Sequence, residues 1–430
     1  MFQQPNYEKI INNMQSPEEI KNMFPEMSVD ELADVLSLTI KKDYVSKIIC
    51  ALGMILAFTE DSQINISFNA PSSTGKSHTP LEIAQLFPDD SLERIGSASP
   101  TSFFHRQDSY NKEKNETLVN LERKIIIVYE SLHQQLLEKL RSLLSHDKKE
   151  IVVQITDRTE KGGHRTKNVI LRGHCVMIFC SASNNFDEQE LTRFIMLSPD
   201  IDVEKFEEVI DDTIEKAANP SDYKKRIEND PRRISLRNRI LAIRDERIDN
   251  VVIPFPKEVK SAFSSRHPSK IPRHMRDIKK LISLIKAIAL LNLFQRKRDE
   301  ANNVIAEEKD FNEALKLWDK ISEAQDLNIP PYILKVFNDV VMALYKERLQ
   351  SRVSEDPVGL TRNEVLKKHH EVFNRPLSAI LLRQQFIPMW EAAGLMYQEP
   401  DSNNQRQMLI YPSQTHDQEN EKDIPIDGII

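Results

Sequence analysis

Hydrophobic and polar positions change their spacing twice along the chain. From Tyr7 to about Glu60, apolar residues recur at intervals of three and four, which predicts helices. From about 61 to 200, short apolar runs such as INISFNA, KIIIVYE and CVMIFCSAS alternate with amphipathic segments such as SLHQQLLEKLRSLLS. Strands that alternate with helices predict a parallel sheet covered by helices on its faces. From about 201 to 350 the helical spacing returns, as in RHMRDIKKLISLIKAIALLNLF, and predicts an all-helical lid.

The last part of the chain has its own pattern. A Pro-Pro pair at 330–331 interrupts the helical spacing and marks a boundary. Beyond residue 360, LTRNEVLKKHHEVF and RPLSAILLRQQFIPMWEAAGLM predict two helices, and YQEPDSNNQRQMLIYP predicts two strands joined by a polar turn. This order resembles a winged-helix domain, whose second helix commonly enters the major groove of DNA. The resemblance places Arg383 and Gln384 towards DNA and Arg406 on the wing, although such domains equally serve as protein-docking or autoinhibitory modules.

These boundaries divide the chain into five segments. We expect an N-terminal helical segment at 1–45, an α/β core at 46–200, a helical lid at 201–330, a winged-helix domain at 331–412 and a tail at 413–430. The tail is polar and acidic, and we expect it to be disordered. At 430 residues, with 40% hydrophobic and 29% charged residues, the chain is long enough for two or three domains with their own apolar cores.

The net charge and the length of the apolar runs limit how this chain can contact nucleic acid or a membrane. The net charge of -7 means that any contact with nucleic acid has to come from local basic clusters. No apolar run is long enough to span a membrane, and the first residues lack the basic-then-apolar order of a signal peptide, so we expect a cytoplasmic protein without a membrane partner. The three cysteines have no metal-ligand spacing.

The segment INISFNAPSSTGKSH reads as a strand, a loop and the start of a helix. Its loop matches the P-loop pattern, except that alanine replaces the first glycine. In that pattern, backbone N–H groups surround the phosphates of ATP, a lysine reaches the outer phosphates and a hydroxyl binds Mg²⁺. We therefore expect ATP at Ala70, Pro71, Ser72, Ser73, Thr74, Gly75, Lys76 and Ser77, with Ser77 also a ligand of Mg²⁺. The competing interpretation is an accidental Gly-Lys-Ser sequence in a loop.

The run KIIIVYES is an apolar strand that ends in an acid, as in a Walker B strand. Glu130 is the candidate general base that polarises the attacking water, and it is the second candidate ligand of Mg²⁺. An aspartate of the magnesium shell usually precedes this glutamate, but the chain has Tyr129 there, which favours slow hydrolysis. In the competing interpretation Glu130 merely caps a helix after a buried strand.

Two further residues complete a predicted hydrolysis site. The strand VMIFCSASN ends in polar residues, and Asn184, ahead of Ser183, is the candidate sensor beside the γ-phosphate. Asparagine is also an everyday turn residue. Nine residues later, in LTRF, Arg193 is the candidate arginine finger, which would stabilise developing charge on the γ-phosphate of a neighbouring subunit. The alternative is an ordinary surface arginine.

The order of these motifs resembles that of an AAA+ ATPase and, within that class, the minichromosome-maintenance helicases. The resemblance covers roughly residues 40 to 320 and rests on KIICALGMILAF, the P-loop, LRSLLSHDKKEI and CVMIFCSASN. MRDIKKLISLIKAIALL is similar to the helix that bears the second sensor arginine, which places that role on Arg276. The short N-terminal segment cannot be the oligonucleotide-binding collar of these helicases. The resemblance therefore implies a divergent relative, such as a helicase of a virus, plasmid or other mobile element.

A basic hairpin is predicted between the Walker B helix and the sensor strand. In EIVVQITDRTEKGGHRTKNVILRG, two β-like runs flank a Gly-Gly turn. The related helicases project a hairpin from this position into a central pore. On that resemblance Lys161, His164, Arg165 and Lys167 bind the phosphates of a single DNA strand without reading its sequence. The alternative is a solvated hairpin tip.

These features favour an ATP-driven DNA helicase or translocase that acts during replication. We expect a homo-oligomeric ring, a hexamer, with each ATP site between Lys76 of one subunit and Arg193 of the next. The alternative is a nucleotide-dependent switch or remodeller that acts on protein partners in transcription or transposition. The tyrosine at position 129 is the best support for that alternative.

Overall fold

The computed structural model describes residues 17–96, 109–111, 116–129, 134–157, 165–181, 191–351, 359–402 and 404–413. The chain forms two compact units, Met1–Asp326 and Leu327–Ile430. Across these residues, no helix combines the length and the apolar character needed to cross a membrane.

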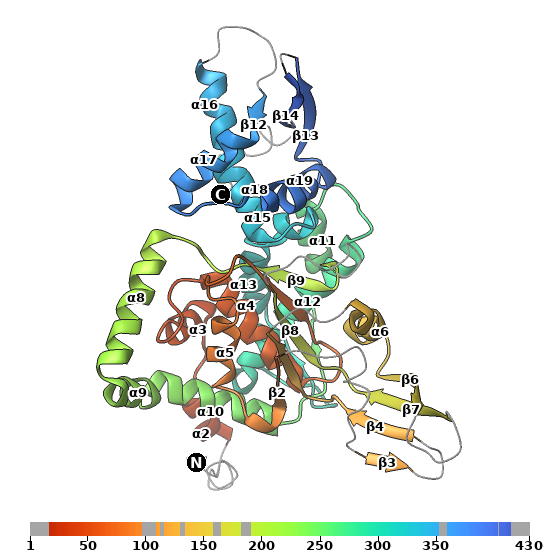
Figure 1. The fold of residues 1–430 in the computed structure, drawn as a ribbon. Coiled ribbons are helices and arrows are strands. Elements are labelled where there is room, and N and C mark those ends of the chain that lie inside the picture. Colours follow the sequence, from red (N-terminus) through yellow and green to blue (C-terminus); the bar gives the residue numbers. More distant parts are fainter. Residues whose placement is uncertain are drawn as a thin grey trace, which may run out of the picture. The chain divides into compact units, whose positions relative to one another are not determined.

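The centre of the first unit is a five-stranded parallel sheet. Its strand order is β2-β5-β8-β1-β9, and every neighbouring pair runs parallel. The bounds are β1 Asn65–Asn69, β2 Leu92–Ile95, β5 Ile125–Val128, β8 Val176–Ser181 and β9 Phe194–Leu197. Helices cover the sheet (Figure 1), which confirms the predicted α/β class with a parallel sheet flanked by helices. Strand β2 was not predicted.

Alternate residues of β5, β8 and β9 enter two different hydrophobic cores. Ile125 and Ile127 of β5 join the larger core, whereas Ile126 and Val128 join the smaller one. Side chains of successive strand residues point to opposite faces, so the two cores lie on the two faces of the sheet. Helix α6 (Gln134–Leu144) contributes to the smaller core. Burial on both faces explains why these strands read as continuous apolar runs in the sequence.

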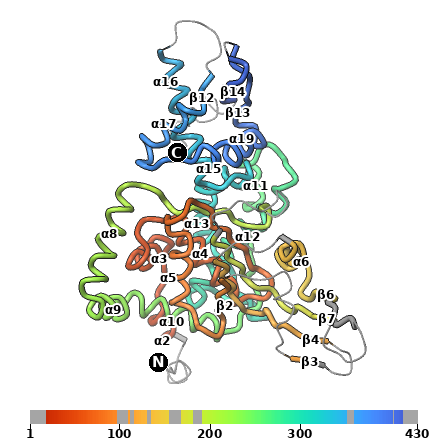
Figure 2. The backbone as a smooth tube through the Cα atoms, in the orientation of Figure 1, coloured from red at the N-terminus to blue at the C-terminus, as the bar shows by residue number. Residues whose placement is uncertain are grey.

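The larger core joins the N-terminal helices to helices far along the chain. It contains residues from Phe24 to Ile321. The N-terminal helices are α2 Pro17–Met23, α3 Val29–Leu36 and α4 Tyr44–Ile55, and α5 His78–Ala84 follows the P-loop. Figure 2 shows α3, α4 and α5 in red and orange beside the green and teal helices α10 Pro231–Asp245, α12 His274–Leu291 and α13 Glu308–Asp319.

The region after β9 is largely helical, as the sequence predicts. Besides α10, α12 and α13, it contains α8 Val203–Ala218, α9 Pro220–Glu228, α11 Pro256–Arg266 and α14 Ser322–Asp326. Two short strands, β10 (Val251–Val252) and β11 (Val304–Ile305), pair in parallel here. The expectation of an all-helical segment was therefore wrong at these two strands, because two-residue strands leave no periodicity in a sequence.

A second, four-stranded sheet has the order β3-β4-β7-β6. The predicted hairpin is present as the antiparallel pair β6 (Glu150–Asp157) and β7 (Arg165–Arg172). Strand β4 (Glu116–Asn120) runs parallel to β7 and antiparallel to β3 (Ser109–Asn111), and neither strand was predicted. The hairpin is thus the edge of a larger sheet. Residues 158–164, which include its predicted tip, lie outside the described part of the chain.

The second unit combines helices with a small antiparallel sheet. Its helices are α15 Pro331–Val336, a π-helical segment Phe337–Met342, α16 Ala343–Ser351, α17 Arg362–Phe373, α18 Ala379–Leu381, a π-helical segment Leu382–Phe386 and α19 Ile387–Ala392. Strands β12 (Leu360–Thr361), β13 (Met396–Asp401) and β14 (Asn404–Pro412) pair in the order β12-β14-β13. Arg383 and Gln384 are exposed on the π-helical segment, and Arg406 is exposed on β14. The predicted tail beyond Ser413 falls outside the described residues.

Candidate nucleotide site

The P-loop sequence lies at the carboxyl edge of the parallel sheet. Residues 70–77 connect the end of β1 to the start of α5. Strand β1 has β8 on one side and β9 on the other, and Asn69 is level with Ser181 at the end of β8. In open α/β sheets, ligands bind beyond the carboxyl ends of the strands. The predicted phosphate-binding loop is therefore where this topology favours a ligand.

The backbone of the loop is curved by two residues with positive φ. Ser73 has φ 64° and Gly75 has φ 97°. The first angle is unusual for a residue with a Cβ, and the second suits glycine. Turns of this kind collect backbone N–H groups around an anion. The Lys76 side chain folds back into the loop, where its ammonium donates to the Pro71 carbonyl over 2.6 Å.

The hydroxyl predicted to bind Mg²⁺ lies beside the sensor strand. The Ser77 hydroxyl hydrogen-bonds the thiol of Cys180, a buried residue of β8. Burial raises the pKa of the Cys180 thiol to about 12, and Ser77 and the Lys76 charge oppose that rise. The thiol is therefore neutral at physiological pH. The neutral thiol is the local partner of the Ser77 hydroxyl, and a metal ion could take its place.

A buried ion pair contacts the P-loop, and no sequence pattern predicted it. Lys205, at the start of α8, places its ammonium 2.6 Å from Oδ1 of Asp43 and 3.3 Å from the Thr74 carbonyl. Both side chains are almost fully covered. Burial raises the pKa of Asp43, and the Lys205 charge opposes that rise. Asp43 also accepts from the Asp200 N–H over 2.6 Å. The pair joins the starts of α4 and α8 to the P-loop.

The predicted base and sensor follow the ends of β5 and β8. Glu130, Ser183 and Asn184 belong to stretches that the structure does not describe. The two strands end on the same carboxyl edge as β1, because all three run parallel. Tyr129 occupies the position before the glutamate, and its side chain packs against the larger core. This position therefore supplies packing to the sheet.

Arg193 and Arg276 lie together at the opposite, amino edge of the sheet. Both line a cavity of about 310 Å³, and Arg193 Nε donates to Ser145 Oγ over 2.8 Å. Arg276 donates to the hydroxyl of Thr192, the residue before Arg193. Asn65 at the start of β1 lines the same cavity. The P-loop begins five residues later, roughly 16 Å further along the strand. The two arginines therefore lie away from the P-loop of their own chain.

The arginine cavity is strongly basic. Three lysines line it, and two acids, Asp61 and Asp147, share its wall. Burial lowers the pKa of Lys280 to about 8, although the buried Asp277 carboxylate lies 2.8 Å from its ammonium. The lysines are Lys279, Lys280 and Lys286. An excess of cations beside two arginines is suited to an anion such as a phosphate.

The basic residues of the hairpin are only partly described. Lys161 and His164 fall in the undescribed tip. Arg165 is level with Asp157 at the open end of the pair, and Lys167 is level with Ile155. The backbone of both lies on β7, at the end of the hairpin next to the undescribed residues.

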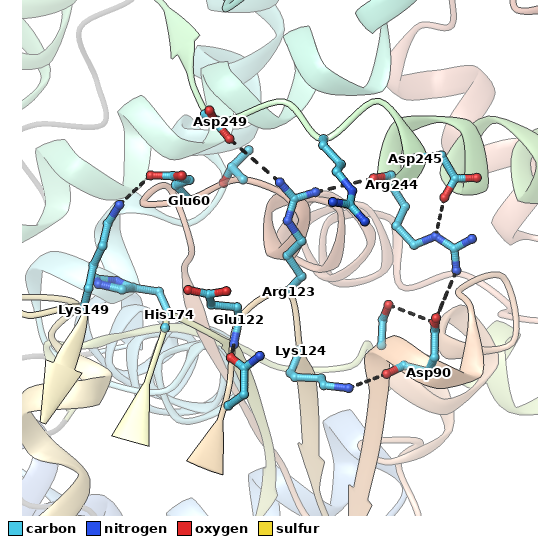
Figure 3. A pocket seen from close by; sticks show the side chains of 15 residues that line it. Glu60, Asp90, Glu122, Arg123, Lys124, Lys149, His174, Arg244, Asp245 and Asp249 are labelled. Carbon is cyan, nitrogen blue, oxygen red and sulfur yellow. Dashed lines mark hydrogen bonds and ion pairs between the residues drawn. The ribbon is translucent and has the colours of Figure 1, made fainter. Parts of the chain in front are cut away.

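A second, larger cavity also lies at the amino ends of the strands, and Figure 3 shows its charged lining. Its volume is about 750 Å³. Charges of both signs pair across it, as in Lys149 with Glu60 and Arg244 with Asp90. The buried His174 ring lines the cavity, and neither of its nitrogens has a hydrogen-bond partner among the described residues. Charges of both signs therefore line this cavity, whereas cations predominate in the arginine cavity.

One group of side chains in the described residues has ligand atoms close enough for a metal. These atoms, on His267, His274 and Asp326, lie within 4.8 Å of one another. However, Trp318 Nε1 donates to His267 Nε2 over 3.1 Å, so the proton of a neutral His267 ring is on Nδ1. That Nδ1 lies 2.8 Å from Asp326. Hydrogen bonds therefore account for the cluster, and His267 has no free lone pair for a metal.

Comparison with known proteins finds no family model and no curated protein that matches this chain. The function therefore has to be argued from the geometry of the P-loop and of the arginine cavity.

Proposed function

We propose that this chain is an ATPase that resembles the AAA+ class and drives movement along single-stranded DNA as a homo-oligomeric ring. The observation that supports it most is the placement of Ala70–Ser77 after β1 of a parallel sheet. The loop is there joined to α5, with Lys76 and Ser77 at the sheet's carboxyl edge. This is the position in which a P-loop holds phosphates.

ATP and Mg²⁺ fit the residues around the loop. Lys76 would exchange the Pro71 carbonyl for phosphate oxygens, and the Ser77 hydroxyl would exchange Cys180 for Mg²⁺. Glu130, two residues beyond the end of β5, would act as the base and Asn184 as the sensor. A bound Mg²⁺ would neutralise charge that develops on the phosphates. Tyr129 supplies no carboxylate to its shell.

The arginine cavity supports a site shared between subunits. Arg193 and Arg276 lie at the amino edge and their own P-loop at the carboxyl edge. An ATP completed by these arginines must therefore belong to another copy. A contact that joins different surfaces of two copies closes into a ring when the rotation permits. We propose a hexamer, with Arg193 as the finger and Arg276 as the second sensor, both acting across the subunit interface.

The hairpin β6–β7 is the proposed DNA contact. Arg165 and Lys167 lie on β7, and Lys161 and His164 fall outside the described residues. These four side chains would neutralise backbone phosphates in the centre of the ring. The helices after β9 would form the lid over the nucleotide. The three-stranded sheet and helices of the C-terminal unit support a winged-helix domain as a further proposal.

The proposal is tested by the ATPase rate of the purified protein with and without single-stranded DNA. We expect DNA to stimulate hydrolysis, and we expect stimulation to weaken steeply with salt. Replacing Lys161, Arg165 and Lys167 with alanine should remove the stimulation and leave the basal rate. Lys76→Ala, the control, should remove both rates. Equal rates with and without DNA in the parent protein, from low to physiological salt, would refute the motor.

Tyr129 favours one alternative function. Its side chain packs in the core where a magnesium-shell carboxylate is expected, which suits a slow ATPase that assembles with ATP and remodels protein partners. That protein would bind ATP through Lys76 but show no stimulation by DNA. The same rate measurement therefore separates the two functions.

A further inference from the structure

Helix α8 carries an apolar stripe that its own unit leaves uncovered. The stripe consists of Val203, Phe206, Ile210 and Ile214, which recur at intervals of three and four and are 37 to 60% exposed. Lys205 leaves the helix in another direction and is buried against Asp43. One side of α8 is thus fixed to the P-loop, whereas the stripe faces solvent. Single exposed apolar residues are ordinary, but a contiguous row of this kind marks an interaction site.

Two acids border the stripe. Glu207 lies one helical turn after Val203, and Asp211 lies one turn after Glu207. Both acids therefore line one edge of the stripe. Neither acid has an ion-pair partner among the described residues. The neighbouring acids Glu204 and Glu208, by contrast, pair with Lys42 of the same unit. The edge of the stripe therefore presents uncompensated negative charge.

A matching groove lies between α11 and α12. Its volume is about 460 Å³, its lining is mostly apolar, and Met275 on its rim is 71% exposed. Lys260 and Lys270 are its charged lining residues, and in the described structure neither has an ion-pair partner. No acid lines it. The apolar wall comprises Ile253, Pro256, Val259, Phe263, Ile271, Met275, Ile278 and Ile282.

We propose that the α8 stripe of one copy of this chain docks into the α11–α12 groove of a second copy. Apolar side chains of the stripe meet apolar walls, and Glu207 and Asp211 meet Lys260 and Lys270. Figure 1 places α8 and α11 on opposite sides of the first unit. One copy therefore uses both surfaces at once, each with a different neighbour, and such a contact propagates from copy to copy.

This inference rests on the proposed ring, because it names the two surfaces that would join neighbouring subunits. The first turn of α8 touches the P-loop through Lys205 and the Thr74 carbonyl. The groove's Met275 directly precedes Arg276 on α12. Docking would therefore bring the arginine cavity of one copy towards the P-loop of the next. The proposal thus links the apolar contact to the shared ATP site.

The first test is the sedimentation velocity of the full chain over a range of concentrations, with and without Mg-ATP. Ile210→Ser with Ile214→Ser should weaken self-association roughly tenfold or more, as removal of central apolar contacts does. The matched control is Ile234→Ser with Ile380→Ser, two exposed isoleucines outside both surfaces, which should associate like the parent. A parent chain that stays monomeric under all these conditions would overturn the proposal.

A charge exchange then identifies the partner surface. Glu207→Lys with Asp211→Lys and Lys260→Glu with Lys270→Glu should each weaken association. An equal mixture of the two double variants should pair, because the new lysines of one meet the new glutamates of the other. If the mixture does not pair, or if only the groove variant loses association, the groove receives some other segment.

These readouts are independent of hydrolysis. Association that depends on α8, in a protein without DNA-stimulated ATPase, would refute the proposed motor and retain this contact. DNA-stimulated ATPase with association indifferent to α8 would refute the contact alone.

Discussion

Lys205 is a single residue on which the position of the P-loop depends. Its ammonium binds Asp43 and the Thr74 carbonyl, so removing it leaves a buried carboxylate without its cation. We expect Lys205→Met to lower the free energy of unfolding by about 3–5 kcal/mol, the usual cost of breaking a buried pair. ATP affinity should fall as well, because Thr74 loses its support.

The comparison variants for Lys205 separate loss of a partner from loss of a charge. Lys205→Met with Asp43→Asn should recover much of the stability in urea denaturation, since the uncompensated carboxylate is gone. Lys216→Met, an exposed lysine on the same helix, should be nearly neutral. Equal stability of Lys205→Met and Lys216→Met would contradict this role.

His146 makes stability depend on pH. Burial and the neighbouring His174 ring, stacked 5.2 Å away, lower the pKa of His146 to about 4. The unfolded chain binds a proton near the ordinary value of about 6.5, so protonation favours unfolding between these two values. This contribution to stability is complete above about pH 6.5, is lost as pH falls towards 4, and changes no further below that.

The pH effect of His146 is measured with a glutamine variant. His146→Gln keeps a donor for the Cys175 carbonyl but does not titrate. We expect the urea midpoint of the parent to fall more between pH 7.5 and pH 5 than that of the variant. Parallel pH profiles of parent and variant would show that His146 does not contribute.

Among single residues, the sequence predicts roles only for those that belong to a local motif. Gly75, Lys76 and Ser77 were predicted because the loop sequence itself carries the pattern. The pair of Asp43 and Lys205 spans 162 positions and has no pattern, so only the folded chain shows it.

At the scale of elements, Gly173 connects the four-stranded sheet to the five-stranded parallel sheet. It lies between β7 and β8, has φ 90°, and a Cβ there would come 2.7 Å from the Glu122 backbone nitrogen. Gly173→Ala should therefore lower the free energy of unfolding by at least about 1–3 kcal/mol, the usual cost of a strained backbone residue.

The control for this element is Gly96→Ala. A Cβ at Gly96 meets nothing within 4 Å, so its unfolding free energy should change by less than about 0.5 kcal/mol. Denaturant midpoints of the two variants give the comparison. If Gly173→Ala were as stable as Gly96→Ala, the close approach to Glu122 would not constrain the junction.

Elements with long apolar runs were predictable, and short ones were not. The apolar runs of β5 and β8 are buried and stand out in the sequence, and β1 alternates apolar with polar residues. Strand β2 reads Leu-Glu-Arg-Ile, and β3 has three residues, so neither leaves a clear period. The parallel pairing of β4 with β7 joins distant segments, which no local pattern specifies.

At the scale of the whole molecule, the P-loop and the arginine cavity lie at opposite edges of one sheet. The start of the P-loop is roughly 16 Å along β1 from the cavity. The motif order predicts roles in hydrolysis for the P-loop and for the two arginines of the cavity. In one copy the two lie apart because the strands are parallel, so under the proposed function we expect turnover to depend on assembly.

That separation makes a prediction for mixed subunits. Arg193→Ala should bind ATP but not hydrolyse it, because its P-loop is intact and the finger it offers to its neighbour is missing. Lys76→Ala should fail to bind ATP, yet it still carries Arg193. In a ring assembled at random from equal amounts, about a quarter of the interfaces pair an intact P-loop with an intact finger. The mixture should therefore recover about a quarter of the parent rate if the interfaces act independently.

Each variant alone is the control, and its rate should stay near background at the same total concentration. A mixture no more active than its two components would mean that Arg193 does not act on a neighbour. Hydrolysis would then need an arginine from the carboxyl edge of the same chain.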